Sequence, residues 1–408
     1  MTSYGLISDL LRGISIGIGL SYPKIIHNYI KVPIGILCVL TVIYAFNQAL
    51  DLVRFPASVA CMILCWLLLI ASSFTFGTRR TGILVKFFDI PGKFCLQWIS
   101  VFFTPAFITL PLSTPISAKE AMLIAAVFIV GFAVQMGGVA YICVGLQWIT
   151  RQIVSSRVVD GNNILYQTPA FQRDMLIGKW IHRNFDYIVF GVGFIISIPI
   201  YFSIGYAMPF HLFTSVITFL IMLHAPPARY RIILNPVLCS VAISWLVYYI
   251  FSAIRGVSFL DDLRQYKTGR TYLTLFHVPH TDKITSAPGA GDILTSLMDV
   301  AIVSLAMPIY AYRADLWRNA IVLLPTILVM TFGSFFIYPP ICHIIGISPE
   351  RSLAFAGRSI TLALGTPFTE ALAAMSSVCF VLYGTFMVAM ASIPPLVHSL
   401  RHIVGLGN

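Results

Sequence analysis

Long apolar runs without charged residues alternate with short polar gaps along most of the chain. A membrane-spanning helix needs about 20 consecutive apolar residues, so charge-free runs near that length are typical of one. They cover residues 32–50, 55–78, 94–118, 121–150, 187–228, 232–254, 319–349 and 371–400. The stretch 293–312 is interrupted by one charge, at Asp299. Because 187–228 is long enough for two helices with a turn near Gly205 to Pro209, the pattern predicts about ten crossings.

Prolines interrupt two of these runs, 94–118 and 319–349. Proline has no N–H for the helical ladder, so these segments are expected to be kinked or re-entrant. The predicted fold class is all-α: a polytopic integral membrane protein with at least one broken or re-entrant helix. The pattern does not specify the organelle or the plasma membrane.

The composition supports this interpretation. Hydrophobic residues make up 58% of the chain and charged residues 10%, whereas a soluble protein is about half apolar and about a quarter charged. The net charge of +11 comes from basic residues that stand singly or in pairs between apolar runs, as membrane flanks do. We therefore expect the lipid bilayer as a partner and no nucleic acid.

Two longer polar gaps divide the chain. Residues 151–186 form a basic linker, and residues 256–292 are expected to be an ordered, partly helical loop. The predicted domains are a membrane-proximal segment, 1–31, a four-helix membrane domain, 32–150, the linker, and a larger membrane domain, 187–408.

No pattern in the sequence predicts catalysis, a cofactor or a metal. The eight cysteines lie in apolar stretches, as small buried side chains do. Asp261 and Asp262 lack the further acids of a magnesium motif, and His277 and His280 have no third ligand nearby. We therefore expect a protein that is not an enzyme.

One segment has the features of an anion site inside a membrane. Arg358 offers a forked donor, hydroxyls follow at Ser359, Thr361 and Thr366, and Gly365 and Pro367 would break a helix. Broken helices expose N–H groups that can face an anionic substrate. The alternative is an interfacial turn with an arginine that reaches the membrane surface.

Four further residues are candidates. Asp299 is an acid within a span, and burying its charge in the membrane is costly. Such an acid often takes part in proton coupling or pairs with a basic residue, here Arg313 or Arg358. The alternative is that Asp299 lies at a helix end. Asn235 is a substrate contact or a helix N-cap. Pro308 would kink its span, and Tyr310 contacts substrate or is an interfacial aromatic.

The second half resembles the LrgB/CidB family of membrane proteins. The matching segments follow in the family's order: Arg229–Arg231 with Leu234–Leu238, then Val303–Tyr310, then Arg358–Thr361. The first half resembles the partner family LrgA/CidA at Phe55–Val59 and Phe102–Ala106. The resemblance implies a fusion of the two, LrgA-like over 32–150 and LrgB-like over 187–408. The family carries a further glycine- and histidine-rich segment, so we expect the LrgB-like domain to be C-terminally incomplete.

The resemblance also implies a function. It predicts transport of small hydroxy- or keto-monocarboxylate anions, such as glycolate, glycerate or pyruvate, by alternating access. The carboxylate would lie near Arg358, Ser359 and Thr361. The alternative is a holin-like or antiholin-like regulator of membrane permeability that acts by oligomerisation, and a homo-oligomer is compatible with either function.

Overall fold

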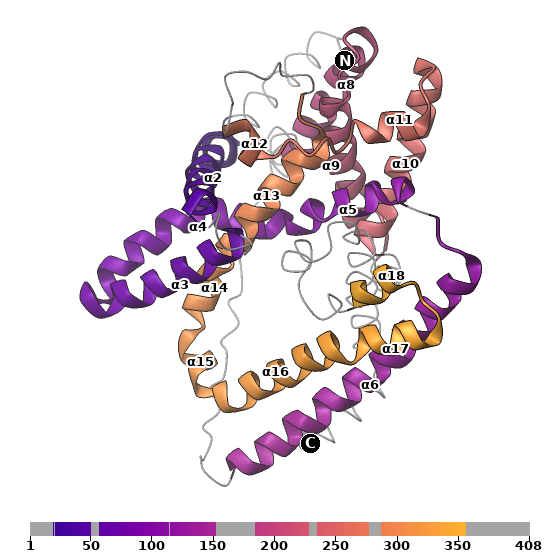
Figure 1. Cartoon of the computed structure of the whole chain (residues 1–408). Coiled ribbons are helices and arrows are strands. Elements are labelled where there is room, and N and C mark those ends of the chain that lie inside the picture. The colour runs from indigo at the N-terminus through magenta and orange to yellow at the C-terminus, as the bar shows by residue number, and fades with distance from the viewer. Residues whose placement is uncertain are drawn as a thin grey trace.

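The structure is a computed structural model that describes residue 19 and residues 21–49, 57–113, 115–151, 184–227, 235–276 and 287–355. All regular secondary structure in these ranges is helical (Figure 1). The predicted all-α class is confirmed.

The helices of the first half follow one another closely. They are the π-helical turn η1 (His27–Lys31), α2 (Val32–Ala49), α3 (Ala57–Thr75), α4 (Gly77–Phe102), α5 (Thr104–Ile108), the 3-10 turn η2 (Leu110–Leu112) and α6 (Ala118–Arg151). The expected span 94–118 is therefore corrected. Helix α4 begins at Gly77, and the basic residues expected in a gap before the span lie within the helix.

The second half contains long helices joined by short ones. They are α8 (Phe185–Ser203), α9 (Met208–His224), α10 (Pro236–Arg255), α11 (Phe259–Arg264), α12 (Tyr272–Phe276), α13 (Ala290–Ser304), α14 (Ala306–Ala311), α15 (Arg313–Arg318), α16 (Ala320–Phe336), α17 (Tyr338–Ile345) and α18 (Pro349–Ala354). The turn predicted between the two helices of 187–228 lies between α8 and α9, where Gly205 has a φ of 79°.

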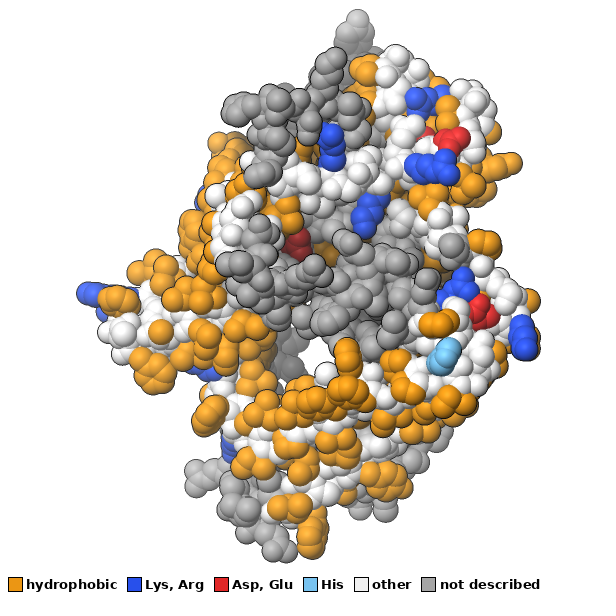
Figure 2. Space-filling view, in the orientation of Figure 1, with side chains coloured by type: hydrophobic (Ala, Val, Ile, Leu, Met, Phe, Trp, Pro, Cys, Tyr) orange, Lys and Arg blue, Asp and Glu red, His pale blue; other side chains and the backbone are white. Residues whose placement is uncertain are grey.

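Eight helical segments of the described residues are long and apolar enough to cross a membrane, and Met208–His224 is a shorter apolar helix. These correspond to nine of the predicted crossings. The tenth, 371–400, lies outside the described residues, as does most of the linker 151–186. Hydrophobic side chains cover the visible face of α16 (Figure 2), where Leu324, Ile327 and Leu328 are each more than half exposed. Such a surface suits lipid contact.

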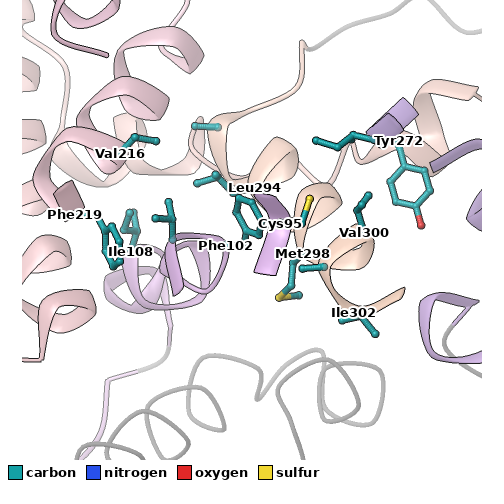
Figure 3. Packing of buried hydrophobic residues seen from close by; sticks show 14 of the residues in the cluster. Cys95, Phe102, Ile108, Val216, Phe219, Tyr272, Leu294, Met298, Val300 and Ile302 are labelled. Atoms are coloured by element: carbon teal, nitrogen blue, oxygen red, sulfur yellow. The ribbon is translucent and has the colours of Figure 1, made fainter. Parts of the chain in front are cut away.

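Helix α13 lies at the centre of the packing. The span Ala290–Ala311 is 61% buried, whereas the other candidate spans are at most 39% buried. It packs against α2, α3 and α4 from the first half and against α9 from the second. Figure 3 shows Leu294 and Met298 of α13 near Cys95 and Phe102 of α4. The two halves of the chain therefore share one core.

Prolines break the helices where the sequence predicts it. Pro105 cannot donate to the carbonyl of Val101, and α4 ends at Phe102. The hydroxyl of Thr104 donates to that carbonyl instead, at 2.7 Å. A second break at Ile337 separates α16 from α17, just before Pro339 and Pro340. Side-chain donors allow such breaks inside a membrane.

A buried carboxylate fixes the start of α13. Asp292 is fully buried and accepts hydrogen bonds from the N–H groups of Gly289, Thr268 and Gly269 and from the Thr268 hydroxyl, at 2.7–3.0 Å. The N–H of Gly291 donates to the carbonyl of Tyr266 at 2.7 Å. A Cβ at Gly289 would lie only 2.3 Å from that carbonyl oxygen. Only glycine fits there.

We predict that Gly289→Ala lowers the free energy of unfolding by about 1–3 kcal/mol, the usual cost of forced overpacking. Unfolding of the detergent-solubilised protein by denaturant would measure it. Gly82→Ala is the matched control, because a Cβ at Gly82 meets nothing within 4 Å and alanine favours the helix. Equal stability of the two variants would contradict the packing argument.

Candidate functional site

Six residues that the sequence indicates for binding or helix breaking lie outside the described residues. They are Arg358, Ser359, Thr361, Gly365, Thr366 and Pro367. Their roles stay predictions. The remaining four candidates, Asn235, Asp299, Pro308 and Tyr310, lie on three different helices or their ends.

Asn235 caps the start of α10. Its side-chain oxygen accepts a hydrogen bond from the N–H of Val237 at 2.9 Å, and Pro236 occupies the first helical position. This is the local geometry of an N-cap followed by proline. The capping role that the sequence left open is therefore observed.

Pro308 and Tyr310 lie at a break in the central span. Pro308 lacks the N–H that would donate to the carbonyl of Ser304, and α13 ends at that residue. Tyr310 is 7% exposed and packs against Leu69. The guanidinium of Arg313 lies 4.2 Å from the centre of its ring. The predicted broken helix is confirmed, and one face of the tyrosine is occupied by a cation.

Asp299 lies on the buried helix α13, where it connects three helices. Its carboxyl interacts by hydrogen bonding with the hydroxyls of Ser58 on α3 and Tyr272 on α12. Burial, and after it the charge of Asp299, raises the pKa of Tyr272 above its ordinary value. Arg313, one predicted partner, is instead over Tyr310. Among the described residues, Asp299 has hydroxyl partners and no ion pair.

A second acid, Asp262 on α11, is fully buried at the centre of a polar cluster. The Nε2 of His211, in the first turn of α9, lies 2.9 Å from the Oδ2 of Asp262, and both side chains are 0% exposed. The hydroxyl of Tyr201 on α8 donates to the Oδ1 of Asp262 at 2.8 Å. We refer to His211, Asp262, Tyr201 and Arg255 as the His211 cluster.

Arg255 completes the His211 cluster from the end of α10. Its Nη1 lies 3.9 Å from the Oδ1 of Asp262, and its guanidinium lies 4.7 Å from the centre of the Tyr201 ring. The Nη2 donates to the carbonyl of Gly205 at 3.0 Å. The cluster therefore holds the α8–α9 corner, α10 and α11 together through one buried carboxylate.

Hydroxyl groups surround the histidine on its other sides. The hydroxyl of Tyr248 donates to the carbonyl of His211 at 2.9 Å. It also lies 2.9 Å from the hydroxyl of Ser215, which is 3.2 Å from that of Tyr266. Burial raises the pKa of Tyr266 above its ordinary value. These groups are neutral donors and acceptors, so they add no charge to the His211 cluster.

The sequence does not predict the His211 cluster. Asp262 stands beside Asp261 as in an incomplete metal motif, and His211 lies in an apolar run. A histidine and an acid buried in a membrane protein are costly and usually pair. The position of His211 within an apolar run is therefore the feature of the sequence that indicates a buried polar partner. Its partner, 51 residues further on, could not be identified without the fold.

A cavity of about 600 Å³ lies elsewhere, between α6, α16 and α17. Its lining is almost entirely apolar, with Gln135 and Ser334 among the few polar side chains. None of the predicted site residues lines it. An apolar lining does not offer the donors that a small carboxylate requires, so we do not assign the cavity to the anion.

The described helices thus define a class, the multi-pass integral membrane protein with a broken central span and buried titratable groups. Residues 215–403 match the model of the LrgB-like family, so the C-terminal half contains an LrgB-like domain. This range includes Asp262, Asp299 and the segment around Arg358. It does not reach residues 32–150, whose LrgA-like character stays a prediction.

The chain is also similar to the plastidal glycolate/glycerate translocator 1, chloroplastic, of Arabidopsis thaliana. The two are 23% identical over 344 residues, which is 83% of this chain and 61% of the relative. The chain therefore spans less than two thirds of that relative's length. No solved structure matches the chain.

We predict that Asp262→Asn lowers the free energy of unfolding by about 3–5 kcal/mol, because it removes one partner from a buried charged cluster. Unfolding in detergent would measure the change. Asp261→Asn is the adjacent control, since Asp261 pairs with Arg264 in an exposed contact at 2.6 Å, and surface pairs contribute at most about 1 kcal/mol. A larger loss at Asp261 would contradict the assignment.

Proposed function

We propose that this protein is a membrane transporter of small hydroxy- or keto-monocarboxylate anions, of the size of glycolate, glycerate or pyruvate. The observation that carries the proposal is the sequence similarity to a glycolate/glycerate translocator over 83% of the chain, together with the LrgB-like domain. The multi-pass helical architecture is consistent with it. We infer translocation without chemical conversion of the substrate.

In this proposal the carboxylate binds near Arg358, Ser359 and Thr361. A guanidinium can bind both carboxylate oxygens at once, and the nearby hydroxyls can orient the substrate's own hydroxyl or keto group. Gly365 and Pro367 would interrupt a helix beside them. Transport proceeds by alternating access, in which the site opens to one side of the membrane at a time.

The proposal can be tested by uptake of labelled glycolate into liposomes that contain the purified protein. We predict saturable uptake that unlabelled glycerate or pyruvate inhibits, because a carrier has a finite number of selective sites. Empty liposomes are the control. Leakage that is graded by solute size and does not saturate would contradict the proposal and support a holin-like permeability regulator.

We predict that Arg358→Ala raises the KM for glycolate about 10–100-fold, as expected when a charge-assisted hydrogen bond of about 1.5–3 kcal/mol is lost. Arg358→Lys should recover only part of the affinity, because lysine cannot bind both oxygens in a fork. Arg318→Ala, at an exposed arginine, is the control. Unchanged uptake by correctly inserted Arg358→Ala protein would exclude the assigned site.

A further inference from the structure

The apolar cavity between α6, α16 and α17, three helices that lie side by side in Figure 1, contains two buried polar atoms. They are the side-chain Oε1 of Gln135 on α6 and the hydroxyl oxygen of Ser334 on α16, and neither has a hydrogen-bond partner among the described residues. Gln135 is 7% exposed and Ser334 is 1% exposed. An unpaired polar atom is costly in apolar surroundings. A molecule that pairs with both atoms is therefore favoured in this cavity.

The cavity is elongated, because its lining follows one face of each helix. On α6 the lining residues recur every three or four positions from Leu123 to Ile142, which is the spacing of one helix face. At 1.5 Å per residue this face is about 28 Å long, close to the roughly 30 Å thickness of the hydrocarbon core of a bilayer. On α16 and α17 the lining extends from Val329 to Ile345.

The cavity opens at the surface of the molecule. Val130, Val134 and Ile337 of its lining are each more than half exposed. The helices that carry them are candidate membrane spans, Ala118–Leu146 and Ala320–Ile345, so the opening faces hydrocarbon. A molecule that enters the cavity therefore comes from the bilayer and is largely apolar.

The volume of the cavity excludes a further helix as its occupant. A helix about 28 Å long and about 10 Å across would occupy roughly 2,000 Å³. The cavity has a volume of about 600 Å³, which is less than a third of that. A single hydrocarbon chain is much narrower than a helix and matches both the length and the apolar lining of the cavity.

The two polar atoms lie near the middle of their spans. Gln135 is near the centre of the 34-residue helix α6, about 25 Å from either end at 1.5 Å per residue. Ser334 is near the centre of the 26-residue span Ala320–Ile345. Lipid headgroups lie outside the hydrocarbon core. A polar group that meets Gln135 and Ser334 therefore belongs to the chain of a lipid and not to its headgroup.

A hydroxyl group satisfies both atoms at once. The Oε1 of Gln135 only accepts hydrogen bonds, whereas the hydroxyl of Ser334 can donate or accept. A ligand hydroxyl can therefore donate to Gln135 and accept from Ser334. A keto oxygen only accepts, so it would leave the Oε1 of Gln135 unpaired.

We propose that this cavity binds one chain of a membrane lipid that carries a hydroxyl group at mid-chain. No covalent bond forms or breaks on binding. The inference goes beyond the proposed function, because the site is separate from the residues assigned to the transported anion. Gln135 belongs to the first half of the chain and Ser334 to the second, so the bound hydroxyl joins the two halves. The hydroxyl of Tyr338, which donates to the carbonyl of Gly131 at 2.8 Å, joins them nearby.

The test uses the full chain in dioleoylphosphatidylcholine vesicles. A small fraction of a photoreactive phosphatidylcholine is added, with a diazirine beside a mid-chain hydroxyl. We predict that the label is found on peptides of α6, α16 and α17. Phosphatidylcholine with a mid-chain hydroxystearoyl group should compete about tenfold more strongly than its stearoyl counterpart, as two neutral hydrogen bonds permit. Equal competition by the two lipids, or a label that avoids these helices, would overturn the proposal.

Two variants remove the polar atoms one at a time. In Ser334→Ala and in Gln135→Leu we expect the preference for the hydroxylated lipid to fall several-fold, because each change removes one of the two hydrogen bonds. Thr326→Val is the matched control on α16, since the hydroxyl of Thr326 donates to the carbonyl of Val322 at 2.7 Å and lies outside the cavity lining. An unchanged preference in both cavity variants would place the hydroxyl elsewhere and overturn the assignment.

A third variant fills the cavity without touching either polar atom. A Cβ at Gly137 or at Gly138 meets nothing within 4 Å, but of the two only Gly138 lines the cavity. We predict that Gly138→Leu removes most of the labelling of α6, whereas Gly137→Leu labels as the wild type does. Full labelling of Gly138→Leu would overturn the proposal. These measurements require no transport, so their outcome is independent of the proposed function.

Discussion

The hydrogen bonds of the Asp292 carboxylate fix the central helix of this protein, and the rest of the structure depends on that helix. The buried carboxylate accepts donors from two separate turns, at Thr268–Gly269 and at Gly289. It thereby satisfies the N–H of Gly289, which the start of α13 would otherwise leave unpaired, and ties that start to the turn at Thr268–Gly269. With its start held there, α13 contacts α2, α3 and α4 on one side and α9 on the other.

Polar groups decide which helices pack together, because apolar contact alone discriminates little between helix partners inside a membrane. Lipid tails solvate leucine or valine as well as another helix does, so small residues, packing and interhelical hydrogen bonds decide which helices meet. Here Asp262 connects α8, α9, α10 and α11, and Asp299 connects α13 with α3 and α12. Each acid connects elements that lie far apart in the sequence.

The same polar groups are suited to function. A buried titratable pair costs stability unless it is fully compensated, and the His211 cluster leaves one ring nitrogen of His211 without a partner among the described residues. The break before Pro308 follows the helix that contains Asp299. Gly205, which has a positive φ, lies in the turn just before α9, the helix that contains His211. Charge and irregular backbone thus occur together in the protein interior, as in transporters built from broken helices.

The sequence by itself determined the class, most of the spans that the structure describes and the proline breaks, because each depends on neighbouring residues. Run length against bilayer thickness predicted the helices, and the missing N–H of proline predicted the breaks before Pro105 and at Pro308. The local pattern at Asn235, an amide side chain followed by a proline, likewise included the N-cap among its alternatives. The tertiary structure alone decided that Tyr201, His211 and Asp262 meet, since hydrogen-bond partners on different helices share no period or spacing. It also showed that Arg313 contacts Tyr310 and not Asp299, because the position of a charge in space depends on how the helices pack.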